Sequence, residues 1–241
     1  MSFKKIVVIS KAGKAGKSTL SKQLVVPMLN AKWIEIETIN EKGTGATVTI
    51  AGRKMDTIAS FVESNQTNVV LDVGVSNYQL FIKELSQLEE TVNAIDYWII
   101  PVQSDRAFVA EGISTAKDLD EQLGVDASRI VFIANNVEEV EDMQDDFAYV
   151  AQLCKENGMH FVNAPIVQNP AFSIMSKRPK SIIEYANELI DWDKKILAEK
   201  NHEARSDLAA EKILQQRVRF LAKNLRGVWA NSPLANLVEE K

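Results

Sequence analysis

Residues 5–29 carry the pattern that most constrains how this chain folds. An apolar run at 6–9 leads into a loop that reads Ser-Lys-Ala-Gly-Lys-Ala-Gly-Lys-Ser-Thr over 10–19, and an apolar-periodic segment follows over 20–29. A strand, a glycine-bearing loop ending in Gly-Lys-Ser and a helix, in that order, form the context of a phosphate-binding P-loop. The loop N–H groups and the helix N-terminus attract anions. The pattern therefore predicts a nucleotide phosphate site.

Within this loop, Lys17 is expected to reach the β- and γ-phosphates, and the Ser18 hydroxyl to ligate Mg²⁺. The usual pattern, G-x-x-x-x-G-K-[ST], has a glycine where this chain has Lys11. Gly13 and Gly16 remain at the positions where the backbone must approach phosphate closely. The alternative is an ordinary strand-to-helix turn with surface lysines. The residues expected to hold the phosphates are Gly13, Lys14, Ala15, Gly16, Lys17, Ser18 and Thr19.

The composition narrows the class of protein. A chain of 241 residues, 46% hydrophobic and 25% charged, is long enough for one large α/β domain with a buried core. No apolar run approaches the roughly 18 to 20 residues that span a bilayer, and the run after Lys5 is too short for a signal peptide. Cys154 is the only cysteine, so an internal disulfide is excluded, a structural zinc site is disfavoured and a reducing cytoplasm fits.

Apolar strand-like runs alternate with helix-like segments up to about residue 190. This alternation indicates a parallel sheet covered on both faces. We therefore expect a three-layer α/β fold of the P-loop NTPase class, with a mainly parallel sheet, over residues 1–190. A C-terminal helical extension over 191–241 is expected to pack on the same domain. The expected strands cover 6–9, 33–37, 69–72, 97–102, 130–133 and 160–162, and the expected helices cover 20–29, 55–61, 78–88, 108–123, 147–156 and 182–190.

Polar residues at strand ends are the candidates for chemistry, because ligands of open parallel sheets bind at the carboxyl ends of strands. Asp72 follows an apolar run and has the place of a carboxylate that holds Mg²⁺, the alternative being a turn or helix cap. Gly74 offers a backbone N–H for a γ-phosphate. Glu35 and Glu37 share one side of their strand, and burying two carboxylates without a purpose is costly. Either both lie at an exposed strand end, or Glu37 positions an attacking water with Glu35 in support.

Asn135 and Asn136 follow the expected strand at 130–133. An amide donates and accepts at once, which suits the adenine edge of ATP, but an Asx turn that closes the strand is equally compatible. Pro165 and Val167 follow the last expected strand and are candidates for an apolar wall beside the base.

The C-terminal segment combines an apolar stripe with basic residues. The net charge of the chain is −5, so any anion-binding face must be local. Three interpretations remain open: a solvated face above a packed stripe, non-specific contact with DNA phosphates, and a helix lying on a membrane surface. The stripe consists of Ile213 or Leu214, then Val218, Leu221, Leu225 and Trp229, and the basic residues are Arg217, Arg219, Lys223 and Arg226.

These motifs resemble the ParA/MinD superfamily of deviant Walker A ATPases, and within it the StbB-type plasmid stability proteins. The resemblance rests on the loop at 11–19, Glu-Ile-Glu-Thr-Ile-Asn at 35–40, Val-Leu-Asp-Val-Gly at 70–74, Asn135 and Pro165. It implies a homodimer that forms face to face on ATP and separates on hydrolysis. It also implies non-specific DNA binding by that dimer and a plasmid-encoded DNA-binding partner that stimulates hydrolysis. By this resemblance, Lys17 binds phosphate and Ser18 binds Mg²⁺. Asp72 matches the Walker B carboxylate, and Glu37 matches the carboxylate near the attacking water.

Two departures from the family pattern bear on the expected rate. Ala12 occupies the position of the family's signature lysine, which reaches across the dimer to the partner's ATP. Lys11 or Lys14 could substitute for that lysine. A glutamate replaces an aspartate in the second-strand motif, which shifts the carboxylate by about 1.5 Å, and a misplacement of about 1 Å can cost roughly 100-fold. We expect slow hydrolysis unless a partner stimulates it. The alternatives are an adaptor that holds nucleotide without turnover, and a small-molecule ligase similar to dethiobiotin synthetase.

Overall fold

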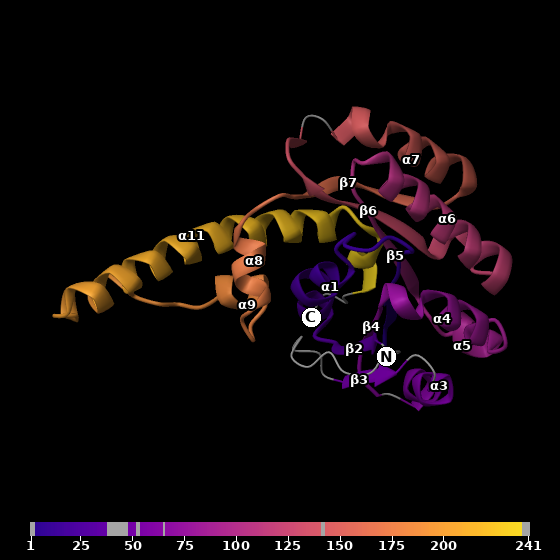
Figure 1. Ribbon diagram of the computed structural model, residues 1–241, viewed down its shortest axis with the longest axis horizontal. Helices are drawn as coiled ribbons and strands as arrows, with labels where there is room; N and C mark the ends of the chain where they lie inside the picture. The colour runs from indigo at the N-terminus through magenta and orange to yellow at the C-terminus, as the bar shows by residue number, and fades with distance from the viewer. Residues whose placement is uncertain (1–2, 38–47, 52–53, 65, 141–142, 238–241) are drawn as a thin grey trace.

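The computed structural model describes residues 3–37, 48–51, 54–64, 66–140 and 143–237 (Figure 1). Its centre is a seven-stranded sheet in the order β3-β2-β4-β1-β5-β6-β7, in which every pairing is parallel. Parallel pairing brings the carboxyl ends of all strands to one edge of the sheet. The strands are β1 Lys5–Val8, β2 Lys32–Glu37, β3 Val48–Ala51, β4 Val69–Val73, β5 Tyr97–Val102, β6 Ile130–Val137 and β7 His160–Val167.

Each face of the sheet is covered by its own layer of helices (Figure 1). Val7 and Ile9 point to one face, which packs against α3 Met55–Ser64, α4 Tyr78–Leu85, α5 Glu89–Asn93, α6 Arg106–Leu123 and α7 Met143–Asn157. Ile6 and Val8 point to the other face, which packs against the helix after the loop, α8 Ala171–Ser176, α9 Ile182–Ala186 and α11 His202–Ala230. The predicted three-layer α/β architecture is confirmed.

Two strands extend beyond their predicted ends. Asn135 and Asn136 lie inside β6 instead of following it, and Pro165 lies inside β7. The register of the β6–β7 pair shifts on both sides of Asn135, and Asn136 adopts a positive φ of 59°. A bulge of this kind accommodates polar residues that sequence reasoning assigns to a turn. Pro165 is tolerated because β7 is an edge strand. Strand β3 and helix α8 were not predicted, and residues 38–40 of the second-strand motif lie outside the described residues.

The helix that follows the loop, here called the P-loop helix, contains a widened turn. It begins as α1 Lys17–Leu20, continues as a π-helical segment Ser21–Val25 and ends as α2 Val26–Leu29. Within it, the Val26 N–H donates to the Ser21 carbonyl five residues back. Pro27 explains the widening, because proline has no N–H and its ring clashes with the carbonyl four residues earlier. The predicted helix at 20–29 therefore exists with an irregular middle.

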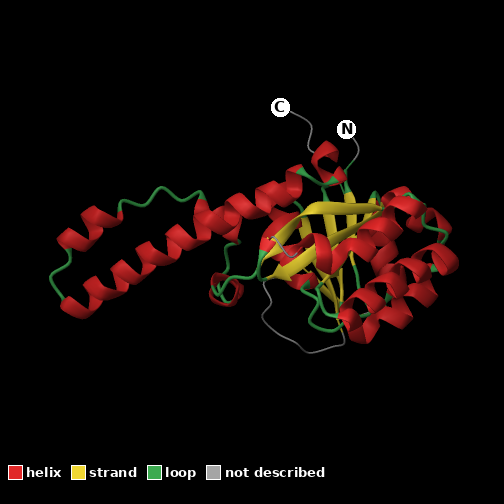
Figure 2. Ribbon diagram, turned by 90° about the horizontal axis from the view of Figure 1, so that it is seen from above, coloured by secondary structure: helices red, strands yellow, loops and turns green. Residues whose placement is uncertain are grey.

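The C-terminal segment forms a long helix that leaves the body of the protein (Figure 2). The predicted stripe from Leu214 to Trp229 is buried on the sheet, and α11 runs through Gly227 without a break. The first part of α11 projects outward and α10 Trp192–Ala198 lies against it. Trp192 Nε1 donates to Gln215 Oε1 at 2.7 Å to fix this pair. We call α10 together with residues 202–213 the arm; its Leu197 is 84% exposed.

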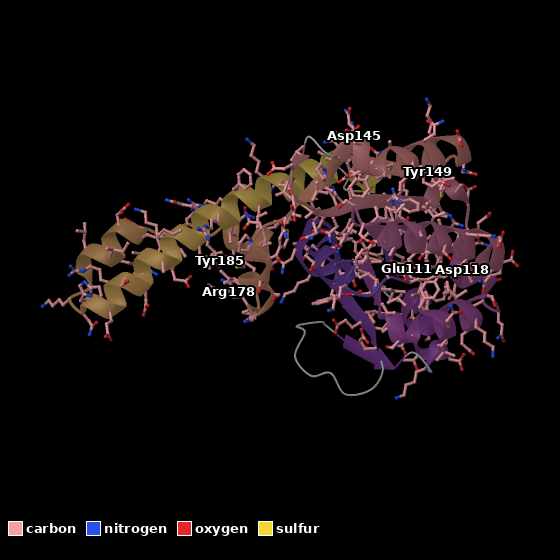
Figure 3. All side chains as sticks on the ribbon, turned by 45° about the horizontal axis from the view of Figure 1, so that its top comes forward. Glu111, Asp118, Asp145, Tyr149, Arg178 and Tyr185 are labelled. Atoms are coloured by element: carbon pink, nitrogen blue, oxygen red, sulfur yellow. The ribbon has the colours of Figure 1, made fainter. Side chains whose placement is uncertain are left out.

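A polar brace fixes the base of the arm to the segment between α8 and α9 (Figure 3). Arg178 makes a bidentate ion pair with Glu211 of α11, with one N–O distance of 3.0 Å. The Tyr185 hydroxyl donates to the same carboxylate at 2.8 Å, and the Arg178 guanidinium lies 5.3 Å from the Tyr185 ring centroid. On the other side of this segment, Lys22 of the P-loop helix donates to the carbonyls of Ser176 and Arg178, each at 2.9 Å. The arm is thereby linked to the P-loop helix through the contacts of one short segment.

Candidate functional site

Two amide side chains hold the glycine-bearing loop in place. Asn135 Nδ2 donates to the Ala15 carbonyl and Gln103 Nε2 donates to the Lys14 carbonyl, each at 2.9 Å. Both amides come from the carboxyl ends of neighbouring strands, β6 and β5. These two bonds fix the carbonyls of Lys14 and Ala15 and so hold the middle of the loop in place. Asn135 is therefore a support of the loop. It also lines the cavity beside the loop, and its role at the adenine edge stays a prediction.

Gly16 is required by both its conformation and its surroundings. Its φ is +97°, and a Cβ added there would lie 2.1 Å from Asn135 Nδ2. Left-handed backbone costs a residue with a Cβ about 1–2 kcal/mol, and displacing Asn135 would also break its bond to Ala15, worth about 1 kcal/mol.

We expect Gly16→Ala to lower the free energy of unfolding by about 2–3 kcal/mol, the sum of these two costs. Gly13→Ala in the same loop is the matched control, because a Cβ at Gly13 meets nothing within 4 Å. Urea denaturation of both variants measures the difference. Equal losses in the two variants would contradict this account of Gly16.

Lys17 is the first residue of α1, at the end of the loop, and is buried. Its Nζ donates to the Ala12 carbonyl at 2.8 Å. Burial lowers the pKa of the Lys17 ammonium, although the charges of Asp72, Glu37 and Glu111 partly offset this effect. The structure thus brings the predicted Lys17, Asp72 and Glu37 together, with an added carboxylate, Glu111 of α6, that was not predicted.

Asp72 carries the clearest sign of a ligand. It is buried at the end of β4, and its Oδ2 has no hydrogen-bond partner. Burial raises the pKa of Asp72 to about 7; a hydrogen bond from Ser18 and the charge of Lys17 lower it, while Glu35 and Glu37 raise it. An unpaired buried carboxylate oxygen is costly unless it meets a cation.

The residues around Asp72 fit Mg²⁺. A carboxylate beside the Ser18 hydroxyl supplies two oxygen ligands, and Mg²⁺ usually takes one or two protein oxygens with water and phosphate completing its shell. Among the described residues, no group of three or more His, Cys, Asp or Glu could hold a metal alone. This donor set therefore suits a metal that arrives with a phosphate ligand.

Glu35 and Glu37 face one small cavity, as their alternation predicted. The cavity has a volume of about 220 Å³ and is also lined by Ser18 and Phe172. The Glu37 carboxylate lies against Gly74, where an added Cβ would meet Glu37 Oε1 at 2.3 Å. The Gly74 N–H donates to the Ile36 carbonyl at 3.0 Å. Its predicted contact with a γ-phosphate is thus replaced by a contact within the protein.

A second cavity of about 320 Å³ opens beside the loop, between the ends of β5, β6 and β7. Its volume lies at the lower end of the range for small-molecule sites. Val167 lines it as predicted, whereas Pro165 does not; the Pro165 carbonyl instead accepts from Asn224 of α11 at 2.9 Å. The other lining residues are Lys14, Gly16, Thr19, Gln103, Asn135, Asn136, Asn169 and Phe172.

Sequence reasoning missed Gln103, Asn169 and Phe172. Gln103 follows β5 directly, so the rule that ligands bind at strand ends could have found it. Phe172 lies between the two cavities and lines both. No sequence pattern marked it, because α8 has only six residues.

The two candidate lysines differ in their surroundings. Lys11 Nζ forms an ion pair with Asp118 Oδ2 of α6 at 2.7 Å and donates to Ser114 Oγ at 2.7 Å. Lys14 lies exposed at the tip of the loop with a φ of 61°. Positive φ is uncommon for a residue with a side chain and tends to mark functional positions. The Lys11 side chain is thus bound within this chain, whereas Lys14 is exposed.

No protein-family model and no curated protein sequence matches this chain. Solved structures do match. Apo McdA from Cyanothece aligns with a TM-score of 0.55 at 13% identity, over 95% of this chain and 99% of that chain. The fold is that of McdA and MinD. A single-residue variant of Cyanothece McdA in complex with ATP aligns at 0.54 and 12%, over 95% and 96% of the two chains. MinD of Aquifex aeolicus aligns at 0.51 and 15%, over 87% and 96%.

Outside the site, the McdA-like fold presents the basic residues of α11 differently from the prediction. Arg219, Lys223 and Arg226 share one side of the helix, but Arg217 lies nearly opposite Arg219, because two residues turn an α-helix by about 200°. Arg219 donates to the Glu188 carbonyl at 3.2 Å and Arg226 to Asn187 Oδ1 at 2.7 Å. Arg217 therefore does not share a face with the other three basic residues. None of the helices in the described ranges is long and apolar enough to cross a bilayer.

Proposed function

We propose that this protein is an ATPase of the ParA/MinD type that binds Mg²⁺-ATP, dimerises on it and acts in positioning DNA, in particular in plasmid segregation. The observation that carries the proposal is the unpaired buried oxygen of Asp72 beside Ser18 and Lys17 at the mouth of the loop. The shared fold with McdA, a variant of which was solved with ATP, supports the nucleotide.

In this proposal each residue has a defined part. Lys17 and the N–H groups of 13–19 bind the β- and γ-phosphates, and Ser18 and Asp72 hold Mg²⁺. When bound, the metal neutralises charge on the phosphates. Glu37 orients the attacking water from its place over Gly74, and the cavity lined by Val167 and Phe172 takes the base.

Lys14 is the better candidate for the lysine that reaches the partner's ATP. The family position itself is Ala12, which is buried, and Lys11 is paired within its own subunit. Charge supplied across a subunit interface can raise a phosphoryl-transfer rate by about 10³ to 10⁵. A lysine displaced from the family position supports slow turnover, raised by a DNA-binding partner protein. MinD has been solved in complex with MinC, which supports a partner in general terms.

The deciding experiment is steady-state phosphate release from Mg²⁺-ATP, with and without non-specific duplex DNA, with Lys17→Ala as the blank. We expect slow release that increases with DNA and falls again as salt rises, since phosphate contacts are screened. Release equal to the blank in both conditions would favour the second candidate, an adaptor that holds ATP without turnover. The buried Ala12 in place of the family lysine is the observation that supports this second candidate.

A further inference from the structure

A cluster around Lys11 takes no part in the ATP chemistry proposed above. Lys11 occupies the place where the usual P-loop pattern has its first glycine. Its ammonium pairs with Asp118 at 2.7 Å and donates to the hydroxyl and carbonyl of Ser114 at 2.7 and 3.3 Å. Its backbone N–H donates to Thr115 Oγ1 at 3.1 Å. One residue at the start of the loop is thus tied to α6 through both its backbone and its side chain (Asp118 is labelled in Figure 3).

The same carboxylate oxygen also binds the first residue of α4. The Tyr78 hydroxyl donates to Asp118 Oδ2 at 3.0 Å, and Lys11 Nζ lies 5.6 Å from the Tyr78 ring centroid. Tyr78 is almost fully buried. Lys11, Asp118 and Tyr78 therefore form one connected group, which we call the Lys11 clamp. Hydrogen bonds that include a charged partner are roughly twice as strong as neutral ones.

The clamp holds one end of the segment that follows Asp72. This segment consists of Gly74 and the 3₁₀ turn Val75–Asn77, and it leads directly into Tyr78. Both the first and the last residue of the segment also bind the Ile36 carbonyl, which accepts from the Gly74 N–H at 3.0 Å and from Asn77 Nδ2 at 3.3 Å. The strand that supplies Ile36 also supplies Glu37. The segment is thus linked to the loop through Tyr78, and through Gly74 and Asn77 to the strand with the candidate water-orienting carboxylate.

We propose that Lys11 is a positioning residue: through Asp118 and Tyr78 it holds the 74–77 segment, and with it Glu37, at a fixed distance from the phosphate loop. This inference rests on the proposed ATPase function. A glycine at position 11 offers no such link, because it has no side chain to reach α6. The predicted substitution of Lys11 for the cross-dimer lysine is accordingly replaced by a role within one subunit.

The first test separates positioning from binding. We expect Lys11→Met, which keeps the length of the apolar stem, to lower kcat for ATP about tenfold, as for a sub-ångström misplacement, with KM unchanged. Lys11→Arg keeps the charge and is expected to recover most of the lost rate. Lys117→Met is the matched control, because Lys117 is on the same helix as Asp118 and its ion pair with Glu121 is exposed. An unchanged kcat in Lys11→Met would overturn the proposal.

The second test does not depend on turnover, so it stays readable even if the native protein does not hydrolyse ATP. Amide hydrogen exchange of residues 74–82 in nucleotide-free protein is expected to be faster in Lys11→Met than in the native protein and in Lys117→Met. Adding Lys11→Met to Asp118→Asn should cause little further acceleration, because both changes break the same link. Native exchange rates over 74–82 in Lys11→Met would overturn the clamp. Absence of turnover in the native protein would overturn only the proposed function.

Discussion

An Asp72→Asn variant is expected to be more stable than the native protein at pH 8 and to hydrolyse ATP at least about 100-fold more slowly. The folded pKa of Asp72 is raised to about 7 by burial, whereas an unfolded aspartate has a pKa of about 3.9. The folded state therefore binds the proton more tightly, and native stability falls as the pH rises from about 4 through about 7. Asparagine does not ionise, so the variant avoids this loss, which amounts to at most about 4 kcal/mol.

Urea denaturation without Mg²⁺ at pH 5 and pH 8 measures this effect. The gap between the variant and the native protein should widen at the higher pH, and an exposed site, Asp145→Asn, serves as the control. Mg²⁺-dependent phosphate release should fall roughly 100-fold or more, because a metal ion contributes several kcal/mol to such a transition state. If the variant and the native protein had the same pH dependence of stability, ionisation of Asp72 would not lower the stability of the folded state, and the prediction would be wrong.

Lys17→Ala is expected to abolish both ATP-dependent dimerisation and phosphate release. The variant removes the ammonium at the start of α1 and leaves Asp72 without the positive charge that partly offsets its burial. Light scattering with Mg²⁺-ATP should report a monomer. Dimerisation equal to that of the native protein would remove the basis for a nucleotide switch.

Lys14→Ala is the informative comparison for this variant. It leaves Lys17 and Asp72 in place, so ATP binding should persist while hydrolysis falls. Lys117→Ala, far along α6, should behave as the native protein. The three variants together distinguish a loop that binds phosphate from a lysine that acts across the dimer.

The local sequence pattern was sufficient to predict the fold architecture and the residues at the centre of the candidate site. The apolar strands and the loop at 10–19 placed Lys17, Ser18 and Asp72 together, because strand ends in a parallel sheet meet at one edge. Glu35 and Glu37 were likewise placed on one side by simple alternation.

The misplaced residues depend on contacts between distant parts of the chain. The sequence favours a turn at Asn135, but a bulge keeps Asn135 in β6, and its side-chain amide donates to the Ala15 carbonyl. From the sequence, Lys11 was expected to be a cation available to a second subunit. The fold instead brings Asp118, more than a hundred residues away, beside it. Phe172 gains its position from α8, which is too short for a periodic pattern. Pairing across such separations is decided by packing, and sequence spacing alone does not report it.

The brace at the base of the arm has a mechanical consequence. Helix α8 contributes Phe172 to the lining of both cavities. In the segment that follows α8, the Arg178 carbonyl accepts from Lys22 of the P-loop helix, and the Arg178 guanidinium donates to Glu211 of α11. From Leu214 to His202 the helix extends about 18 Å at about 1.5 Å per residue. A tilt of about 10° at its root would therefore sweep the tip through about 3 Å. The base of the arm is thus a pivot beside the cavity lined by Lys22 and Ser176, and the arm converts a small rotation there into a larger displacement of its tip.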